Sequence, residues 1–305
     1  MLVLPGCELF QPIELVGCPG NDNCPTDSGD ADVDTDTDTD TDADTDTEPL
    51  PPSSGFAWAT SDGTYTATWP DGSVIFSRSG QSTGLQAIAF DPQREQLVVA
   101  TENELLFLGE TSSQDGTAQP LDDKVREILE VDGNIYVAYT QGVAGMVGGQ
   151  LSWLGAPGQV SDVAGIADAG NGQLFLVDLD DTDSGPDSYL FDPSSGDLVM
   201  IDRDFDTSKD RSRYVLADAG NALWVCSRAG AATTVSELAS GNKEPAILPE
   251  QILNDVLGCD YDIGSGELMV FSAQDGLIRV DGSGATTGTI QTSDRLLAGS
   301  AWADI

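Results

Sequence analysis

Two acidic segments carry the side chains best suited to holding a cation. The first, Asp202-Arg203-Asp204-Phe205-Asp206-Thr207-Ser208-Lys209-Asp210, places oxygen ligands at alternate positions, as the first nine residues of an EF-hand loop do. It departs from that loop at Thr207, where a turn glycine is expected, and at Arg213, where a bidentate glutamate is expected. The candidate Ca²⁺ ligands are Asp202, Asp204, Asp206 and Asp210, together with Asp178, Asp180, Asp181 and Asp183 of a second Asp-rich turn. For both segments we favour a solvated loop without metal over a cation site.

Charge and composition exclude several other kinds of chemistry. The 305 residues include 52 acidic and 12 basic side chains and no histidine, for a net charge of −40. Without histidine the chain has no Ser-His-Asp or Cys-His pair and no His-ligated metal site. Residues 1–55 hold 14 acids and no base, so residues 56–305 hold 38 acids and all 12 bases, a net charge of −26. Such a surface repels phosphate backbones and anionic lipid headgroups, which excludes nucleic-acid binding and electrostatic membrane docking.

The five cysteines give the first indication of where in the cell the protein is located. Residues 1–7 read Met-Leu-Val-Leu-Pro-Gly-Cys and resemble the end of a bacterial lipoprotein signal peptide, in which the cysteine, here Cys7, is lipidated. The charged and apolar regions of a full signal peptide are missing, so either the true start lies upstream or the match is accidental and the chain is cytosolic. Lipidation of Cys7 leaves an even number of cysteines for disulfides. Candidate pairs are Cys18 with Cys24 and Cys226 with Cys259, and buried free thiols are the alternative for the second pair.

The N-terminal part of the chain divides into a leader and a linker. Residues 1–26 are interpreted as a truncated signal remnant followed by a leader that contains Cys18 and Cys24. Residues 27–55 alternate Asp with Thr and end in a Pro-rich stretch, so repulsion between like charges and the lack of apolar residues predict a disordered spacer. A lipidated cysteine, an Asp-Thr tether and a folded domain together resemble surface lipoproteins of some Gram-negative bacteria. The resemblance implies a lipid anchor at the outer membrane, or a periplasmic or extracellular location.

A repeated pattern fills residues 56–305. An apolar strand, an aspartate with turn residues and a second strand recur, and the aspartates Asp91, Asp132, Asp168, Asp218, Asp262 and Asp304 are separated by 41, 36, 50, 44 and 42 residues. This spacing, with about four short strands per unit, is typical of β-propeller blades. The fold class is therefore all-β. Because the last copy is only half a repeat, we expect the N- and C-terminal strands to share one blade and close a ring of six, with seven blades or an open β-sandwich as alternatives.

Function is predicted only in outline. The repeat is similar to NHL-type and lactonase-like propeller repeats, and the related Ca²⁺-dependent lactonases hold a metal in the central channel with Glu, Asn and Asp side chains. This chain shows no matching local motif. We therefore expect a monomeric, lipid-anchored binding module of the cell envelope, with no certain cofactor and with an envelope protein or a polysaccharide as partner. The alternative is a lactonase- or esterase-like hydrolase that uses Ca²⁺ in the channel.

Overall fold

The computed structural model describes fourteen stretches of the chain. They are residues 54–80, 83–131, 133–155, 158–160, 162–179, 187–202, 214–218, 223–229, 232–239, 242–243, 256–262, 267–281, 285–292 and 294–303. The chain divides into two units, residues 1–48 and residues 49–305, and all the described residues belong to the second. The predicted leader and most of the linker therefore lie outside the described residues.

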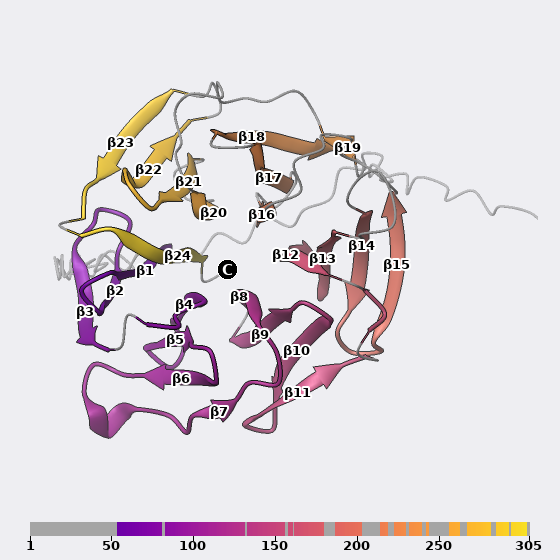
Figure 1. Ribbon diagram of the computed structural model, residues 1–305, viewed down its shortest axis with the longest axis horizontal. Helices are drawn as coiled ribbons and strands as arrows, with labels where there is room; N and C mark the ends of the chain where they lie inside the picture. Colours follow the sequence, from indigo (N-terminus) through magenta and orange to yellow (C-terminus); the bar gives the residue numbers. More distant parts are fainter. Residues whose placement is uncertain are drawn as a thin grey trace, which may run out of the picture. The chain divides into compact units, whose positions relative to one another are not determined.

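Six four-stranded antiparallel sheets make up the second unit, arranged around one axis as the blades of a β-propeller (Figure 1). The first blade, from the inside outward, is β24 (Leu296–Ala303), β1 (Ser54–Thr60), β2 (Thr64–Thr68) and β3 (Val74–Ser79). The second is β4 (Ala87–Asp91), β5 (Gln96–Ala100), β6 (Glu104–Leu108) and β7 (Gln119–Pro120). The third is β8 (Val125–Val131), β9 (Asn134–Tyr139), β10 (Gly142–Val147) and β11 (Gln150–Leu154).

The remaining blades follow the same pattern. The fourth is β12 (Val163–Gly170), β13 (Gln173–Asp178), β14 (Asp187–Asp192) and β15 (Asp197–Asp202). The fifth is β16 (Tyr214–Asp218), β17 (Leu223–Ala229), β18 (Ala232–Ala239) and β19 (Asn242–Lys243). The sixth is β20 (Val256–Asp262), β21 (Glu267–Ser272), β22 (Gly276–Val280) and β23 (Thr286–Ile290). The all-β propeller predicted from the repeat is confirmed.

The two ends of the described chain meet in the first blade. Strand β24 pairs antiparallel with β1 from Ser54 opposite Ala303 to Thr60 opposite Leu296. The innermost strand of each blade contacts the innermost strand of the next, so β24, β4, β8, β12, β16 and β20 form a closed circle. The half repeat at the end of the sequence thus supplies the inner strand that β1, β2 and β3 lack.

The inner strands β20 and β24 approach each other closely. A Cβ atom added to Gly258 of β20 would lie 2.2 Å from the carbonyl oxygen of Gly299 in β24. A Cβ atom added to Gly299 would lie 2.2 Å from Cδ1 of the Phe271 ring. Both contacts are shorter than any side chain tolerates, so the closure of the circle depends on glycine at these positions.

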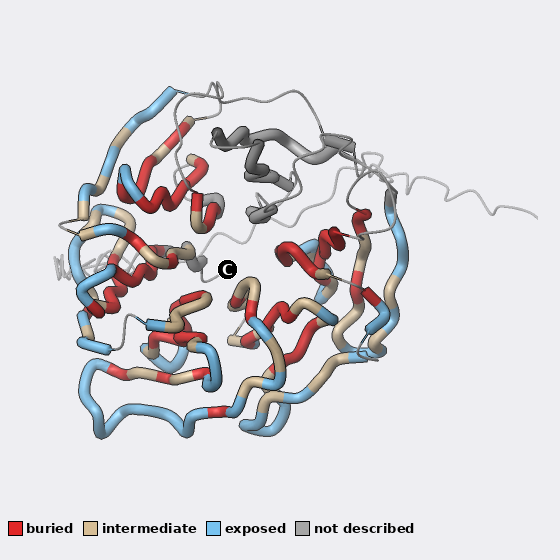
Figure 2. Tube along the Cα trace, in the orientation of Figure 1, coloured by how far each residue is buried: buried red, intermediate tan, exposed pale blue. Residues whose placement is uncertain are grey.

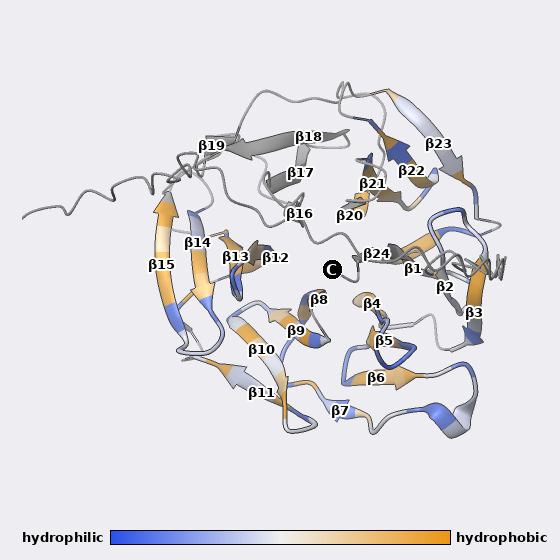
Figure 3. Cartoon of the chain, turned by 180° about the vertical axis from the view of Figure 1, so that it is seen from behind, coloured by the Kyte–Doolittle hydropathy of each residue, from blue (hydrophilic) through white to orange (hydrophobic). Residues whose placement is uncertain are grey.

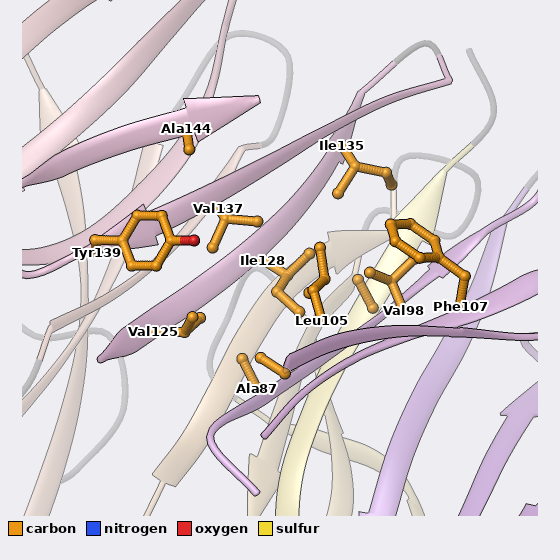
Figure 4. Close-up of a cluster of buried hydrophobic side chains, with 12 residues drawn as sticks. Ala87, Val98, Leu105, Phe107, Val125, Ile128, Ile135, Val137, Tyr139 and Ala144 are labelled. Atoms are coloured by element: carbon orange, nitrogen blue, oxygen red, sulfur yellow. The ribbon is translucent and has the colours of Figure 1, made fainter. Parts of the chain in front are cut away.

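Apolar layers lie between neighbouring blades. The layer between the second and third blades buries side chains of both sheets, with Tyr139 at one side of the cluster in Figure 4. Tyr139 is 1% exposed, and its ring lies 4.8 Å, centroid to centroid, from that of Trp153 on the outer strand β11. Trp153 is half-buried in this contact. Burial of such rings contributes through area and through the aromatic contact itself.

Two of the repeated aspartates, Asp91 and Asp168, bond to the backbone of turns beside their strands. Asp91 is fully buried, and its carboxylate accepts a hydrogen bond of 3.0 Å from the amide of Arg94 and pairs with the Arg94 guanidinium. That guanidinium also donates to the carbonyl of Gly133 in the next blade, at 3.1 Å. Asp168 accepts a hydrogen bond of 2.9 Å from the amide of Gly170. Short acidic side chains bonding to nearby amides are what such turns require, which explains why aspartate recurs in the repeat.

Candidate functional site

The inner edges of the blades are bonded to neighbouring blades. In the second blade, Gln86 precedes β4, and its Oε1 accepts a hydrogen bond of 2.5 Å from the amide of Val125, the first residue of β8. In the third blade, Oε2 of Glu127 accepts a hydrogen bond of 2.9 Å from the amide of Ile166 in β12. Each acceptor reaches an inner-strand amide of the following blade. Because an unbonded buried amide is costly, these side chains both satisfy the inner edge and tie the blades together.

An irregularity in the pairing places a second set of polar groups at the start of the inner strands. The register of β8 against β9 shifts between Val125 and Glu127, which leaves Arg126 in a bulge. Nη2 of Arg126 lies 2.6 Å from Oδ1 of Asp162, the residue before β12. The amide of Asp162 in turn donates to Oδ1 of Asp178 at 2.8 Å. This chain of contacts joins the third blade to the fourth through side chains that are only partly exposed.

Two buried carboxylates stand side by side at the edge of the Asp-rich insertion. Asp178 ends β13, Asp187 begins β14, and the two residues are paired across the strands. Their exposed fractions are 4% and 3%, and the hydroxyl of Tyr189 donates to Oδ2 of Asp187 at 3.3 Å. The buried carboxylate of Asp178 therefore has a structural role as the hydrogen-bond acceptor of a backbone amide.

Tyr139 lies beside the same end of the ring. Burial of its ring raises the pKa of the Tyr139 hydroxyl well above its usual value of 10, and the nearby charges of Asp122 and Asp123 raise it further. The backbone amide of Asp122 acts in the opposite direction. Thr140, the next residue, donates its hydroxyl hydrogen to the carboxylate of Asp123. This part of the ring is thus acidic and holds its tyrosine in the neutral form.

The predicted metal ligands are mostly outside the described residues. Asp178 is placed as above, and Asp202 is the last residue of β15, with its backbone opposite Ser188. Asp180, Asp181, Asp183, Asp204, Asp206 and Asp210 lie outside the described residues. Within the part of the chain that the structure describes, no group of three or more Asp, Glu, Cys or His side chains has the geometry of a metal site.

One predicted disulfide partner is visible. Cys259, in the inner strand β20, is 4% exposed and is disulfide-bonded. Its predicted partner Cys226 lies on β17, a strand that contacts β20, but the Cys226 side chain is outside the described residues. Cys7, Cys18 and Cys24 are outside them entirely. The pairing of Cys226 with Cys259 stays a prediction.

The outer rim carries a feature that the sequence analysis missed. Among the described residues, five large hydrophobic side chains are exposed, and three of them are consecutive on β15: Val199 (60%), Met200 (42%) and Ile201 (37%). This strand is the outermost of the fourth blade and is drawn as exposed in Figure 2 and as largely hydrophobic in Figure 3. The signal in the sequence is a run of four apolar residues, Leu198 to Ile201, where an outer strand would alternate.

The position of β15 is fixed by the blade before it. The turn that opens the strand contains Gly196, and a Cβ atom added there would lie 2.7 Å from the Cα atom of Gly155, just after β11. Gly196 and Gly155 have φ angles of +76° and +79°, a conformation that favours glycine. Asp192 closes the turn by accepting bonds from the amide and hydroxyl of Ser194, which lowers the pKa of its carboxyl. The start of the exposed strand β15 is therefore held by the close contact between Gly196 and Gly155 and by the hydrogen bonds of Asp192.

Larger hollows occur between and beside the blades. A cavity of 620 Å³ lies at the outer part of the first and second blades and has mainly polar walls, including Glu102 and Glu104. Another of 490 Å³ in the sixth blade is lined by Gln, Thr and Asp side chains. A smaller one of 230 Å³, lined by Met146, Val147 and Leu154 among others, reaches Pro193 and Ser194 beside the start of β15.

Comparison with known proteins supports the fold and leaves the activity open. No family model matches the chain, and no curated protein matches it. Among solved structures, a chain of a nidogen–laminin complex is similar with a TM-score of 0.59 at 12% identity, covering 82% of this chain and 99% of that one. A gluconolactonase from Xanthomonas campestris is similar with a TM-score of 0.55 at 17% identity, covering 78% of this chain and 82% of that one. At these identities the likeness is one of fold.

Proposed function

We propose that this protein is a binding module of the bacterial cell envelope, anchored through a lipid on Cys7 and carried on the Asp-Thr spacer. The observation that supports binding is the exposed apolar run on β15 in a domain whose net charge is −26. Apolar side chains gathered on a surface that is otherwise strongly charged are typical of interaction sites. A rigid closed propeller suits this task because its blades present loops and edges without rearranging.

The anchor has support from the sequence. Cys7 follows the short apolar and small residues of a lipobox, and the spacer of residues 27–55 has the length and charge to hold a domain away from a membrane surface. Within the described residues no helix meets the length and apolarity that crossing a bilayer requires. Two attachments, lipid and partner, would then fix the domain in the envelope.

Metabolic labelling tests the anchor directly. The gene with its upstream codons is expressed in its native host, labelled with a palmitate analogue and fractionated. We expect labelled protein in the membrane fraction, loss of the label in Cys7→Ser, and an unchanged label in the matched variant Cys24→Ser. Unlabelled wild-type protein in the soluble cytosolic fraction would contradict the proposal.

A second candidate function is a Ca²⁺-dependent hydrolase acting on lactones or esters. It is favoured by the similarity of fold to a gluconolactonase and by the acidic segments at 178–183 and 202–210. Calorimetric titration with Ca²⁺, followed by a panel of simple lactones with and without chelator, tests it. Saturable Ca²⁺ binding that is weakened in Asp204→Asn, together with chelator-sensitive hydrolysis, would favour this function over the binding module.

A further inference from the structure

The outer edges of the blades are not alike. Strands β7 and β19 have two residues each, and β7 contains Pro120, which has no amide hydrogen to donate. Strand β3 begins with Val74, Ile75 and Phe76, of which only Val74 is exposed, and ends with Ser and Arg side chains, and β23 is made mainly of threonine and glycine. Short, polar or proline-containing edges are the usual protection against pairing with another chain.

Strand β15 lacks these protections along its centre. It has six residues, and its four central positions are apolar. Each position from Leu198 to Met200 is paired on one side with β14, namely Leu198 with Phe191, Val199 with Leu190 and Met200 with Tyr189. In the order of the sheet no further strand lies beyond β15 among the described residues. The register against β14 shifts at Ile201, so the regular part of the outer edge runs from Asp197 to Met200. It is about 13 Å long and is flanked by exposed apolar side chains.

We propose that the outer edge of β15 binds an extended segment of a partner protein by strand addition, and that this segment has an apolar centre and a basic residue at the end beside the Asp192–Asp197 turn. Backbone bonds to β15 would supply affinity, and contacts with Val199, Met200 and Ile201 would select apolar side chains. This inference rests on the proposed binding function and names the chemistry of the partner.

Charge favours a partner segment with a basic residue over a second copy of this chain and over the chain's own residues 1–55. A second copy of the chain would bring another domain of net charge −26 against the first. In an antiparallel pair of two β15 strands, Asp197 of one copy would also face the Asp202 end of the other. The chain's own residues 1–55 have 14 acids and no base, so they are repelled as well. At the turn, the exposed Asp197 and the ionised Asp192 favour a cation on the incoming segment.

Binding of a defined peptide to the full-length chain tests the proposal. The probe is a fluorescein-labelled peptide with a Val-Thr-Val-Thr-Val centre and Lys-Lys at both ends, which serves either strand direction, and binding is followed by fluorescence anisotropy. We expect saturable binding, and hydrogen exchange should show new protection of amides in β15. Two control peptides should each bind at least about tenfold more weakly, a difference of about 1.4 kcal/mol. One has the same ends and a Gly-Ser centre, and the other has the same centre and Glu-Glu ends.

Two variants with the same charge change locate the site. Val199→Glu places a carboxylate in the middle of β15, and Val74→Glu does the same at a valine of equal exposure, 58%, on the outer strand β3. We expect about a tenfold loss of peptide affinity in Val199→Glu and less than about a twofold change in Val74→Glu. Equal losses in both variants would show attraction by overall charge alone and overturn the proposal, as would failure of the wild-type chain to bind the probe.

The same variants separate this inference from the proposed function. Cross-linking in envelopes of the native host reports whether the anchored protein contacts a partner at all. A partner cross-linked equally by wild type and Val199→Glu would keep the binding module and reject β15 as its site. Peptide binding at β15 by a protein that is found in the cytosol would keep the site and reject the envelope function.

Discussion

The inner and outer edges of the blades differ in how the backbone groups of their edge strands find hydrogen-bond partners. Each sheet of the described residues has an innermost and an outermost strand, and each of these has a neighbouring strand of its own sheet on one side only. At the inner edge, Gln86 and Glu127 bond to the amides of Val125 and Ile166 in the next blade, so those amides have partners within the protein. At the outer edge, β15 ends its sheet with apolar side chains in solvent. The inner edge is built for stability, whereas β15 has the features of an edge that takes its partner from outside.

The largest effect is expected where the inner strands close the ring. Gly258→Ala would force a methyl group to within 2.2 Å of the Gly299 carbonyl oxygen, which is backbone and has little freedom to move. We expect a loss of about 3 kcal/mol or more in the free energy of unfolding, measured by urea denaturation. Gly149→Ala is the control, because nothing lies within 4 Å of its Cβ position, although its φ of +83° carries a strain of its own. A smaller loss at Gly258 than at Gly149 would contradict tight closure at the inner strands.

A moderate effect is expected when an inner-edge acceptor is removed. Glu127→Ala leaves the amide of Ile166 without the acceptor that it has at 2.9 Å, and this should lower the free energy of unfolding by about 1–3 kcal/mol. Glu127→Gln keeps an acceptor oxygen of the same reach and should recover most of the loss. If alanine and glutamine cost the same, the hydrogen bond to the next blade is not the cause.

A pH-dependent effect is expected at the buried tyrosine between the second and third blades. The pKa of Tyr139 is raised by burial, so the unfolded chain loses this proton near pH 10 while the folded chain keeps it. The stabilising effect of the raised pKa is complete below pH 10 and is lost as the pH rises above it. Urea denaturation from pH 8 to pH 11 should therefore show a steeper loss of stability for wild type than for Tyr139→Phe. Parallel curves for the two proteins would contradict this assignment.

The smallest effect is expected at the outer edge itself. Val199→Glu and Val74→Glu change side chains that are 60% and 58% exposed, so each should alter the free energy of unfolding by no more than about 0.5 kcal/mol. Urea denaturation of the two variants beside wild type measures this. A loss of several kcal/mol in Val199→Glu alone would mean that β15 is part of the stabilising core, and the contrast between the two edges would then fail.

Much of the fold was predictable because it depends on local sequence patterns, namely recurring aspartates and the apolar strands between them. Asp91 and Asp168 recur in the sequence since each must accept amides of a turn, and the strands between them are apolar because blades pack on both faces. The incomplete last repeat likewise predicted a shared blade, and β24 does pair with β1. Less of the candidate site was predictable. Asp178 is predicted as a cation ligand from its neighbours in sequence, and that role stays a prediction. Its carboxylate is buried and accepts the amide of Asp162, a contact 16 residues away in the chain that no local pattern contains.

The sequence by itself determined the repeat, the all-β class, the acidic charge and the absence of histidine chemistry, because these depend on residue types and on spacing along the chain. Only the tertiary structure decided which edges are protected. Glu127 reaches Ile166 in the next blade, and Gly258 meets Gly299 across the closure of the ring, through distances that no local pattern contains. The exposure of Val199, Met200 and Ile201 was decided in the same way. Leu97, Val98 and Val99 on β5 are just as apolar and fully buried, since β5 lies inside its sheet and β15 at the margin.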